Sequence, residues 1–411
     1  MEVNMSKIAR KTLVIAIIAV LTLAFSMVGF VACDKKNTPA EEAPAVVPAS
    51  VDPITVTDMV GRQVTVKPGT YQRVVCIGAG ALRMYSYIGD VKLLAGIEDI
   101  DNATLENRPK MFDQAARPYV LANADVFNAI ENSCGVGGPQ AQAAEAEKIL
   151  SCNPDIVISE YEDAEKSTAL QQQLGVPVIT VKYGSKGVFD DNVKASFTLL
   201  GKVFARNSRA AVLNAYITEQ TREISERTEN VADADKKSVY ICGLGNWGTT
   251  NQYMTAQNYA PFNVAHIKNA VSGLAMQGIG AIEKEKLVDI SASIDIMIVD
   301  AAAVKNIKPL SGKDATETEI LEGIKAWQNG EVYLEMAYNA YYTNLEIALI
   351  NTWWIAKVAY PNLFEDIDMT EKTNEITFAF LGKDLAEEIF ACGTSFGGYQ
   401  KISNPSAFFG A

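Results

Sequence analysis

The chain has 411 residues, more than one ordinary hydrophobic core accommodates and about right for two domains. An apolar content of 48% and a charged content of 21% are typical of a globular protein and exclude a wholly disordered one. The formal net charge of −13 argues against nucleic acid as a partner, because an acidic surface repels phosphate backbones.

The N-terminus has the composition of an export signal. A basic stretch ending at Lys11 is followed by an almost wholly apolar, uncharged run from Leu13 to Val31. Ala32 then precedes Cys33, as in a bacterial lipoprotein signal, where a small residue stands before the cysteine that receives the lipid. We therefore expect a signal peptide over 1–32 and lipidation of Cys33. An uncleaved anchor is the alternative, since the run could span a bilayer, and either places the body outside the cytoplasmic membrane.

Residues 33–52 are rich in Pro, Ala and Glu and show no apolar period, which predicts a disordered tether. The five cysteines beyond Cys33 include no CxxC pair, so neither a zinc site nor a redox motif is predicted. Cys76 and Cys242 lie in apolar strand patterns, where a thiol usually acts as a small hydrophobic side chain.

One pattern occurs twice in the remaining chain. A β-branched run that ends in glycines at 73–80 (RVVCIGAG) has a counterpart at 238–245 (SVYICGLG). In each half, a helix bearing a glutamate later leads into another apolar strand, at 147–159 and at 285–300. Alternating strands and helices predict βαβ units with parallel sheets, and their duplication predicts two similar α/β lobes.

A long helix is predicted between the two repeats. The stretch from Asn207 to Thr228 has no proline or glycine and carries apolar residues at helical spacing. A helix of this size is roughly 30 Å long, enough to run along both lobes. We therefore expect two Rossmann-like α/β lobes joined by one long helix, with a ligand cleft between them. The expected boundaries are 53–205 for the N-terminal lobe, 206–230 for the linking helix and 231–411 for the C-terminal lobe.

This order of elements resembles that of the class III periplasmic solute-binding proteins of bacterial ABC importers, which serve ferric siderophores, haem and cobalamin. Local phrases match as well: ITVTDMVGR at 54–62, LGVPV at 174–178 and LLG at 199–201. The resemblance implies a lipid-anchored carrier that captures an iron chelate or a corrinoid and delivers it to ABC permease subunits. It implies no enzymatic activity and no cofactor.

The chain is short of catalytic residues. Because the chain has one histidine, His266, multi-histidine metal sites are excluded, and we expect His266 to have a structural role in a helix. The glycine turns at 78–80 and 243–245 lack a suitable acidic partner for a dinucleotide, and turns of a binding lobe explain both. Two other functions remain open: a metalloenzyme lobe like those of nitrogenase components, and a surface or sensory lipoprotein without transport.

Ligands of open α/β sheets bind beyond the carboxyl ends of the strands, so the loops after the predicted strands form the candidate site. The residues selected from these loops are Arg83, Tyr161, Tyr183, Trp247, Thr249 and Thr250. Arg83 would provide a cation for a carboxylate or phosphate, and a surface salt bridge is the alternative role for it.

A dense group of aromatic and polar residues precedes a predicted helix over 345–358. The members selected for the ligand site are Tyr338, Tyr341, Tyr342 and Asn344. Rings for stacking and hydroxyls for orientation suit a planar or chelated ligand, and tyrosine also ligates haem or ferric iron. Spacing alone does not decide whether a tyrosine binds metal here. Packing within the lobe is the alternative for the tyrosines and the expected role of Trp353 and Trp354.

Glu147 and Glu285 occupy corresponding positions in the two repeats. In the family that the chain resembles, one glutamate on the rim of each lobe docks onto arginines of the importer's membrane subunits. The resemblance therefore implies transporter docking for both residues. Glu283 is the alternative in the second lobe, because the segment that follows differs in length. A solvated helix charge is the ordinary role of any such glutamate.

Overall fold

A computed structural model describes residues 51–110, 117–138, 143–245, 250–276, 278–307 and 315–410. The predicted signal peptide, Cys33 and almost all of the predicted tether lie outside these residues, as do Trp247 and Thr249. Within the described ranges, no helix has both the length and the apolar character needed to cross a bilayer.

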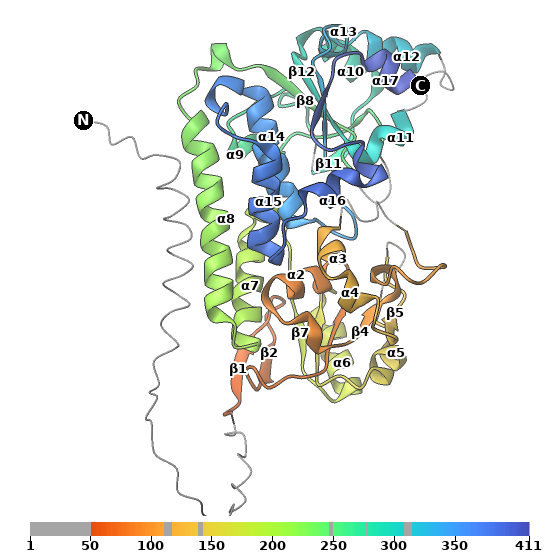
Figure 1. Cartoon of the computed structure of the whole chain (residues 1–411), viewed down its shortest axis with the longest axis vertical. Coiled ribbons are helices and arrows are strands. Elements are labelled where there is room, and N and C mark those ends of the chain that lie inside the picture. The colour runs from red at the N-terminus through yellow and green to blue at the C-terminus, as the bar shows by residue number, and fades with distance from the viewer. Residues whose placement is uncertain are drawn as a thin grey trace, which may run out of the picture. The chain divides into compact units, whose positions relative to one another are not determined.

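The N-terminal lobe is built on a parallel sheet with the strand order β5-β4-β3-β6-β7 (Figure 1). Its strands are β3 (Val74–Ile77), β4 (Leu94–Glu98), β5 (Ser133–Gly135), β6 (Ile156–Ser159) and β7 (Val178–Thr180), preceded by a hairpin of β1 (Ile54–Thr57) and β2 (Gln63–Val66). Its helices are α2 (Ala81–Ile88), α3 (Pro118–Ala122), α4 (Ala124–Phe127), α5 (Ala146–Ser151), α6 (Ala164–Leu174) and α7 (Asp191–Val203). Every residue of β3 and β6 is buried, as expected for central strands of a parallel sheet.

The C-terminal lobe repeats this plan with the strand order β10-β8-β12-β13-β14, in which only β14 is antiparallel to its neighbour. Its strands are β8 (Ser238–Cys242), β10 (Lys268–Asn269), β12 (Ile296–Asp300), β13 (Val332–Glu335) and β14 (Gln400–Ile402), with β9 (Met254–Ala256) and β11 (Ile279–Ala281) forming a separate pair. Its helices are α9 (Ala260–Val264), α10 (Lys284–Ile290), α11 (Val304–Ile307), α12 (Ala315–Glu322), α13 (Lys325–Gln328), α14 (Leu345–Ala359), α15 (Met369–Leu381), α16 (Ala386–Ala391) and α17 (Pro405–Gly410).

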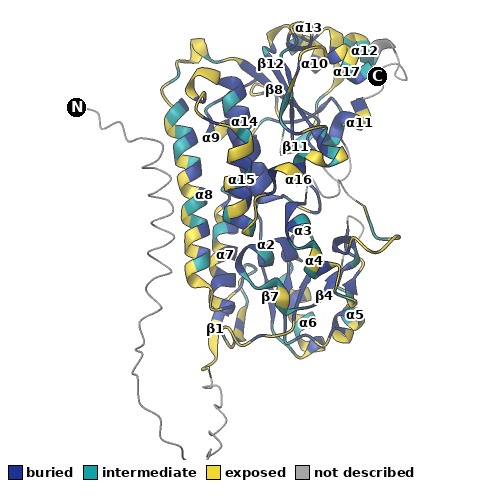
Figure 2. Cartoon of the chain, viewed as in Figure 1, coloured by how far each residue is buried: buried dark blue, intermediate teal, exposed yellow. Residues whose placement is uncertain are grey.

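Helix α8 (Asn207–Thr228) joins the lobes and runs along both of them (Figure 1). It buries one face, which includes Leu213, Ile217 and Ile224, while its opposite side is exposed (Figure 2). The Arg209 guanidinium donates hydrogen bonds to backbone carbonyls in both α2 and α15. The prediction of two α/β lobes joined by one long helix is therefore confirmed.

Helix α14 belongs to the core. Nearly all of its side chains are buried, which agrees with the absence of a polar stripe in its sequence. The Trp353 indole donates to Gln220 of α8 at 2.9 Å, and the Trp354 indole donates to the Leu334 carbonyl at 2.8 Å. Both tryptophans pack in the core, as predicted.

The strand orders locate the expected binding edge of each lobe. In the N-terminal sheet, β4 and β5 follow β3 on one side, and the chain then returns to place β6 and β7 on the other side of β3. In the C-terminal sheet the same change of side occurs between β8 and β12. In open α/β sheets, ligands bind in the crevice beyond the carboxyl ends of the strands at such a switch point. The loops after these four strands therefore position the candidate site.

Candidate ligand-binding site

Arg83 lies at the centre of a network that ties the two lobes together. It is fully buried in α2, and its Nε donates to Asn344 Oδ1 at 3.0 Å. Its terminal nitrogens donate to the carbonyls of Ala340 and Thr343, at 2.8 and 3.0 Å, and to the Tyr183 hydroxyl at 3.2 Å. The guanidinium therefore binds acceptors of the protein itself. It forms no surface salt bridge and does not face an open cleft.

Tyr183 completes this network on the N-terminal side. Its hydroxyl donates to the Gly80 carbonyl at 3.1 Å while accepting from Arg83. Gly80 has φ +85°, and a Cβ there would lie 2.5 Å from the Tyr183 hydroxyl oxygen. Glycine is required at this position both by the backbone conformation and by the close approach of the ring.

The segment from Asn339 to Thr343 forms a strained turn, closed by a β-bridge between those two residues. Tyr341 and Tyr342 follow one another with φ values of 51° and 69°, a left-handed conformation that side chains with a Cβ disfavour. Such strain costs on the order of 1–3 kcal/mol per residue and persists only where the surroundings impose it. The Arg83 hydrogen bonds to this segment provide that constraint.

The two strained tyrosines point to different partners in the N-terminal lobe. The Tyr341 hydroxyl is buried and donates to Glu98 Oε2, at the end of β4, at 2.5 Å. The Tyr342 ring lies 4.5 Å from the Tyr183 ring and remains 36% exposed. Tyr342 is thus the member of the tyrosine cluster that solvent reaches, whereas Tyr341 fills the space between the lobes.

Three further predicted site residues, Tyr338, Thr250 and Asn344, are buried as well. Tyr338 is buried in the C-terminal lobe, with its ring 6.5 Å from that of Tyr259. Thr250 is buried and its hydroxyl donates to the Ala302 carbonyl at 3.4 Å. Asn344 is buried and its amide donates to the Tyr338 carbonyl at 3.0 Å. The structure therefore brings together Arg83 and Tyr183 with the 340–344 segment, whereas Thr250 lies apart from that network.

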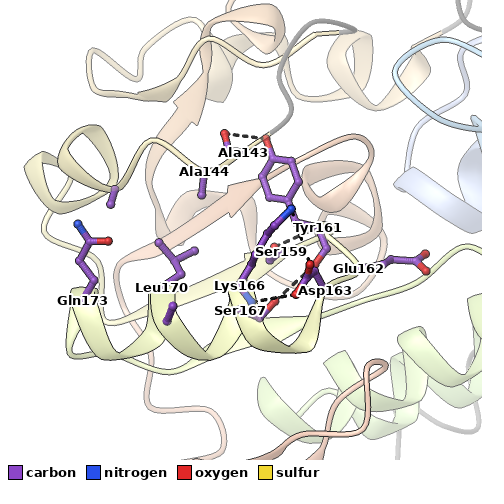
Figure 3. Close-up of a pocket in the computed structure, with 12 residues that line it drawn as sticks. Ala143, Ala144, Ser159, Tyr161, Glu162, Asp163, Lys166, Ser167, Leu170 and Gln173 are labelled. Carbon is purple, nitrogen blue, oxygen red and sulfur yellow. Dashed lines mark hydrogen bonds and ion pairs between the residues drawn. The ribbon is translucent and has the colours of Figure 1, made fainter.

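Tyr161 lines a cavity of about 360 Å³ at the carboxyl end of β6 (Figure 3). Its hydroxyl donates to the Ala143 carbonyl at 3.3 Å, and Lys166 and Asp163 stand at the polar rim. The remaining lining includes small and apolar residues of α6, such as Leu170. Of the predicted ligand residues that the structure describes, only Tyr161 lines this cavity.

Two acidic residues lie next to Gly78, the residue that follows β3. Glu98 accepts the Gly78 N–H at 3.1 Å, and the Cβ of Glu160, after β6, lies 3.5 Å from where a Cβ on Gly78 would stand. Burial raises the pKa of Glu98 to about 7, against the opposing effect of the Tyr341 hydrogen bond. Burial and the neighbouring charges of Glu162 and Glu98 raise the pKa of Glu160 to about 9. Both acids therefore hold a proton more readily than an exposed carboxyl does.

A second acidic pair lies at the carboxyl edge of the C-terminal sheet. Asp300 and Glu335 are the last residues of β12 and β13 and stand opposite one another in register. Asp300 Oδ1 accepts from the Ala302 N–H at 2.8 Å, and Glu335 Oε1 accepts from the Tyr259 hydroxyl at 3.3 Å. Burial raises the pKa of Asp300 to about 7, and burial together with the Asp300 charge raises the pKa of Glu335 well above its usual range.

The described residues contain no group of three or more His, Cys, Asp and Glu side chains arranged to hold a metal ion. His266 follows α9 in a left-handed conformation, with φ 51°, and is not inside a helix as expected. Its Nε2 is hydrogen-bonded to the Ser225 hydroxyl at 2.9 Å, so it has a structural partner on α8.

Glu147 and Glu285 occupy matching places on their helices. Each stands exposed in the first turn, of α5 and of α10 respectively. The residue two positions later, Ile149 or Leu287, is buried in its own lobe. The register predicted between the repeats therefore places both glutamates on the outer side of equivalent helices.

The two α/β lobes, the single linking helix and the segment that bridges them define a class III solute-binding protein. The family described as periplasmic binding protein matches residues 113–336, more than half of the chain. The chain belongs to this family, and the resemblance recognised in its sequence is confirmed.

Known proteins with similar sequences or structures belong to the same class. The molybdate-binding protein MolA of Haemophilus influenzae is 21% identical over 342 residues, which cover 78% of this chain and 88% of MolA. The structure of MolA bound to molybdate matches with a TM-score of 0.59 and 17% identity, over 80% of this chain and 98% of MolA. A periplasmic solute-binding protein of Veillonella parvula matches with a TM-score of 0.62 and 17% identity, over 86% of this chain and 99% of that one. FepB of the same organism matches with a TM-score of 0.58 and 19% identity, over 81% of this chain and 97% of FepB. These likenesses show the fold.

Four acidic residues at the strand ends were not predicted from the sequence as site residues: Glu98, Asp300 and Glu335 are buried, and Glu160 is partly exposed. The loop that begins at Glu160 was recognised, but only Tyr161 was named in it, and Glu98, Asp300 and Glu335 were not considered. A signal was available for Glu160 and Asp300, which follow or end strands expected from the sequence, whereas the strands that end in Glu98 and Glu335 were not predicted. An acid in that position is unusual, because buried charges require compensation.

Proposed function

We propose that the protein is an extracytoplasmic, lipid-anchored substrate-binding protein of an ABC importer, which captures an iron chelate, a siderophore or haem, or a corrinoid. Family membership supports the role of solute-binding protein. The assignment to an ABC importer is supported by MolA, which is described as the periplasmic binding protein of an ABC transporter. The iron-chelate or corrinoid ligand is supported by the resemblance of the sequence to the class III family.

The observation that carries the proposal is the bridging segment between the lobes. The carboxyl edges of both sheets lead toward residues 338–344, which pack against Tyr183 and Glu98 of the N-terminal lobe. A carrier requires a site shared between two lobes, so that binding is coupled to their relative position. Within this site Tyr342, which is 36% exposed and packs its ring on the buried Tyr183, is the aromatic side chain that an incoming planar ligand would meet first.

The ligand is identified by purifying the full-length protein from its own host and recording native mass spectra, metal content and visible absorption. We expect a bound species containing iron or cobalt, with an absorption band in the visible range. Tyr342→Ala should weaken its binding several-fold, because ring stacking contributes about 0.5–1.5 kcal/mol. A protein that consistently carries an unrelated solute, such as an amino acid, contradicts the proposed ligand class.

The lipid anchor is tested separately, since Cys33 lies outside the described residues. We expect the wild-type protein to fractionate with membranes and to lack residues 1–32. Cys33→Ser should release the protein from membranes or leave the precursor unprocessed, because the lipid acceptor is lost. Mature wild-type protein that retains its first 32 residues would contradict this expectation.

A further inference from the structure

Helices α5 and α10, which occupy corresponding positions in the two lobes, carry the same exposed pair of side chains. The sequence EKIL at 147–150 belongs to α5, and EKLV at 285–288 belongs to α10. In each stretch the first and the last residue are exposed, Glu147 with Leu150 and Glu285 with Val288. These two combinations of an acid with an aliphatic side chain are called the outer pairs.

The third residue of each stretch fixes this orientation. Ile149 and Leu287 are fully buried, each in a hydrophobic cluster of its own lobe. Residues three apart lie side by side on a helix. A helix that buries its third residue therefore turns the first and the fourth together toward solvent.

The aliphatic members of the outer pairs are unusually exposed. Leu150 is 45% and Val288 is 51% exposed. Single exposed aliphatic residues are ordinary on a protein surface. Among the residues that the structure describes, however, ten large apolar side chains are exposed, and two of them stand at equivalent positions of the repeat beside an acid. The likeness ends at the next residue, Ser151 in α5 and Asp289 in α10, so general similarity of the helices does not account for it.

The charges around the outer pairs are arranged alike in both lobes. The lysine that follows each glutamate pairs with another acid of its own segment, at 2.8 Å in α5 and at 3.6 Å in α10. Glu147 and Glu285 themselves form no ion pair within the described ranges. Each outer pair therefore presents an unpaired carboxylate beside an apolar side chain, and it fits a surface that places a cation next to an apolar hollow.

Charge and repetition decide between the possible partners. A second copy of this chain that docked through the same outer pairs would bring carboxylates against carboxylates, on a protein whose net charge is −13. Because the outer pair occurs in both lobes, the partner presents its complementary surface twice, as two identical subunits related by a two-fold axis do. Helices α5 and α10 lie in different lobes (Figure 1), so such a partner contacts both lobes at once.

We propose that Leu150 and Val288 are apolar docking contacts, through which the two lobes bind two identical membrane subunits of the importer. This inference rests on the proposed function. It adds an apolar contact to the two glutamates, for which the family resemblance implies docking. Burial of the aliphatic side chain stabilises the complex without directional preference, whereas the glutamate sets specificity and orientation. Each lobe thus docks through one acid and one aliphatic side chain.

Photo-cross-linking in the protein's own host tests the partner. The photoreactive p-benzoylphenylalanine replaces Leu150 or Val288, one at a time, in the full-length protein, and cross-linked peptides are identified by mass spectrometry. We expect both positions to reach the same peptide of one multispanning membrane protein that co-purifies with an ATPase. Val212 and Leu363, which are 41% and 40% exposed outside the two helices, are the control positions and should not reach it.

Leu150→Gln combined with Val288→Gln tests the apolar contact itself. Here the cross-linker stands at Ser151, an exposed neighbour of Leu150. At low expression the yield of the adduct should fall about tenfold, because both aliphatic side chains lose their burial against the partner. Leu363→Gln combined with Val212→Gln is the matched control, with the same two residue types, and should leave the yield unchanged. Circular dichroism of both variants excludes misfolding as the cause.

The outcomes separate this inference from the proposed function. If cross-linkers at positions 147 and 285 reach the permease but those at 150 and 288 do not, or if the glutamine variants leave the yield unchanged, the importer function stands and the apolar contact is wrong. Adducts of 150 and 288 with two different polypeptides, or with a second copy of this chain, overturn the partner. If none of the four positions reaches a multispanning membrane protein, the inference fails together with the importer part of the proposed function.

Discussion

A single arginine links parts of the chain that are more than 250 residues apart. Arg83 donates to Asn344, Thr343 and Ala340, at sequence separations of 261, 260 and 257 residues. Without the guanidinium, Asn344 Oδ1 and the Thr343 carbonyl would lose their hydrogen-bond donor, at a cost of about 1–3 kcal/mol for a buried group, whereas the Ala340 carbonyl also accepts from the Asn344 amide at 3.4 Å. Arg83 therefore contributes to stability through its partners more than through its charge.

Arg83→Met tests this role. The variant keeps most of the apolar volume but removes all donors, so we expect the free energy of unfolding to fall by about 3 kcal/mol or more. Urea denaturation followed by circular dichroism measures the change. Arg222→Met is the control, since Arg222 is an exposed arginine of α8 whose ion pairs with Glu219 and Glu226 lie in solvent. Equal stability of the two variants would contradict the assignment.

Two strand ends give the C-terminal lobe a pH-sensitive element. The buried carboxyls of Asp300 and Glu335 face each other in register at the ends of β12 and β13. Their pKa values are raised in the folded state, to about 7 for Asp300 and well above the usual range of a carboxyl for Glu335. Groups of this kind stabilise the fold fully below their unfolded pKa of about 4, and the stabilisation is lost as the pH rises through the folded value.

The free energy of unfolding is therefore expected to fall between about pH 5 and pH 8, by on the order of 2 kcal/mol. Glu98 and Glu160 have raised pKa values too and add to this slope in the same direction. Glu335→Gln should make the slope shallower, because one titrating group is removed and its repulsion of Asp300 disappears. Urea titrations at both pH values measure this. An unchanged slope in the variant would show that the pair does not titrate in this range.

The bridging segment is the element on which the lobes depend. Residues 339–343 combine two left-handed tyrosines with a β-bridge, and the helix that follows begins with Glu346 buried against the Tyr87 hydroxyl. An irregular, strained segment of this kind is held by its contacts and not by its own preferences. The conformation of residues 339–343 therefore depends on how the two lobes pack.

For the whole molecule, the docking proposal makes a prediction about transport. Glu147→Arg combined with Glu285→Arg should abolish uptake and leave ligand affinity unchanged, because the two residues are exposed on equivalent helices and lie outside the bridging segment. Exposed charges add little to stability, so the double variant should fold normally.

Glu165→Arg combined with Glu319→Arg provides the control, since both residues are exposed glutamates on other helices. Uptake is measured with radiolabelled ligand in whole cells, and affinity is measured on the purified variants. Normal transport by the Glu147/Glu285 variant would show that these two residues do not dock onto the importer. Equal loss of uptake in the control pair would indicate a general effect of charge.

The sequence by itself determined the class of fold. Strands β3 and β8 were recognisable because β-branched runs end in glycine turns, and α8 because apolar residues recur at helical spacing without proline or glycine. These signals are local, and repetition of the same order in both halves made the two-lobed plan readable. Helix α8, Asn207–Thr228, coincides with the stretch that lacks proline and glycine.

Only the tertiary structure decided the partners of the site residues. The sequence identified Arg83 and Tyr341 but associated both with a ligand, whereas the structure pairs them with Asn344 and Glu98, residues 261 and 243 positions away. Which acids at the strand ends became buried was equally undetermined. These hydrogen bonds and this burial depend on how the two lobes pack against the bridging segment. Periodicity and motifs within one stretch of chain carry no information about such long-range contacts.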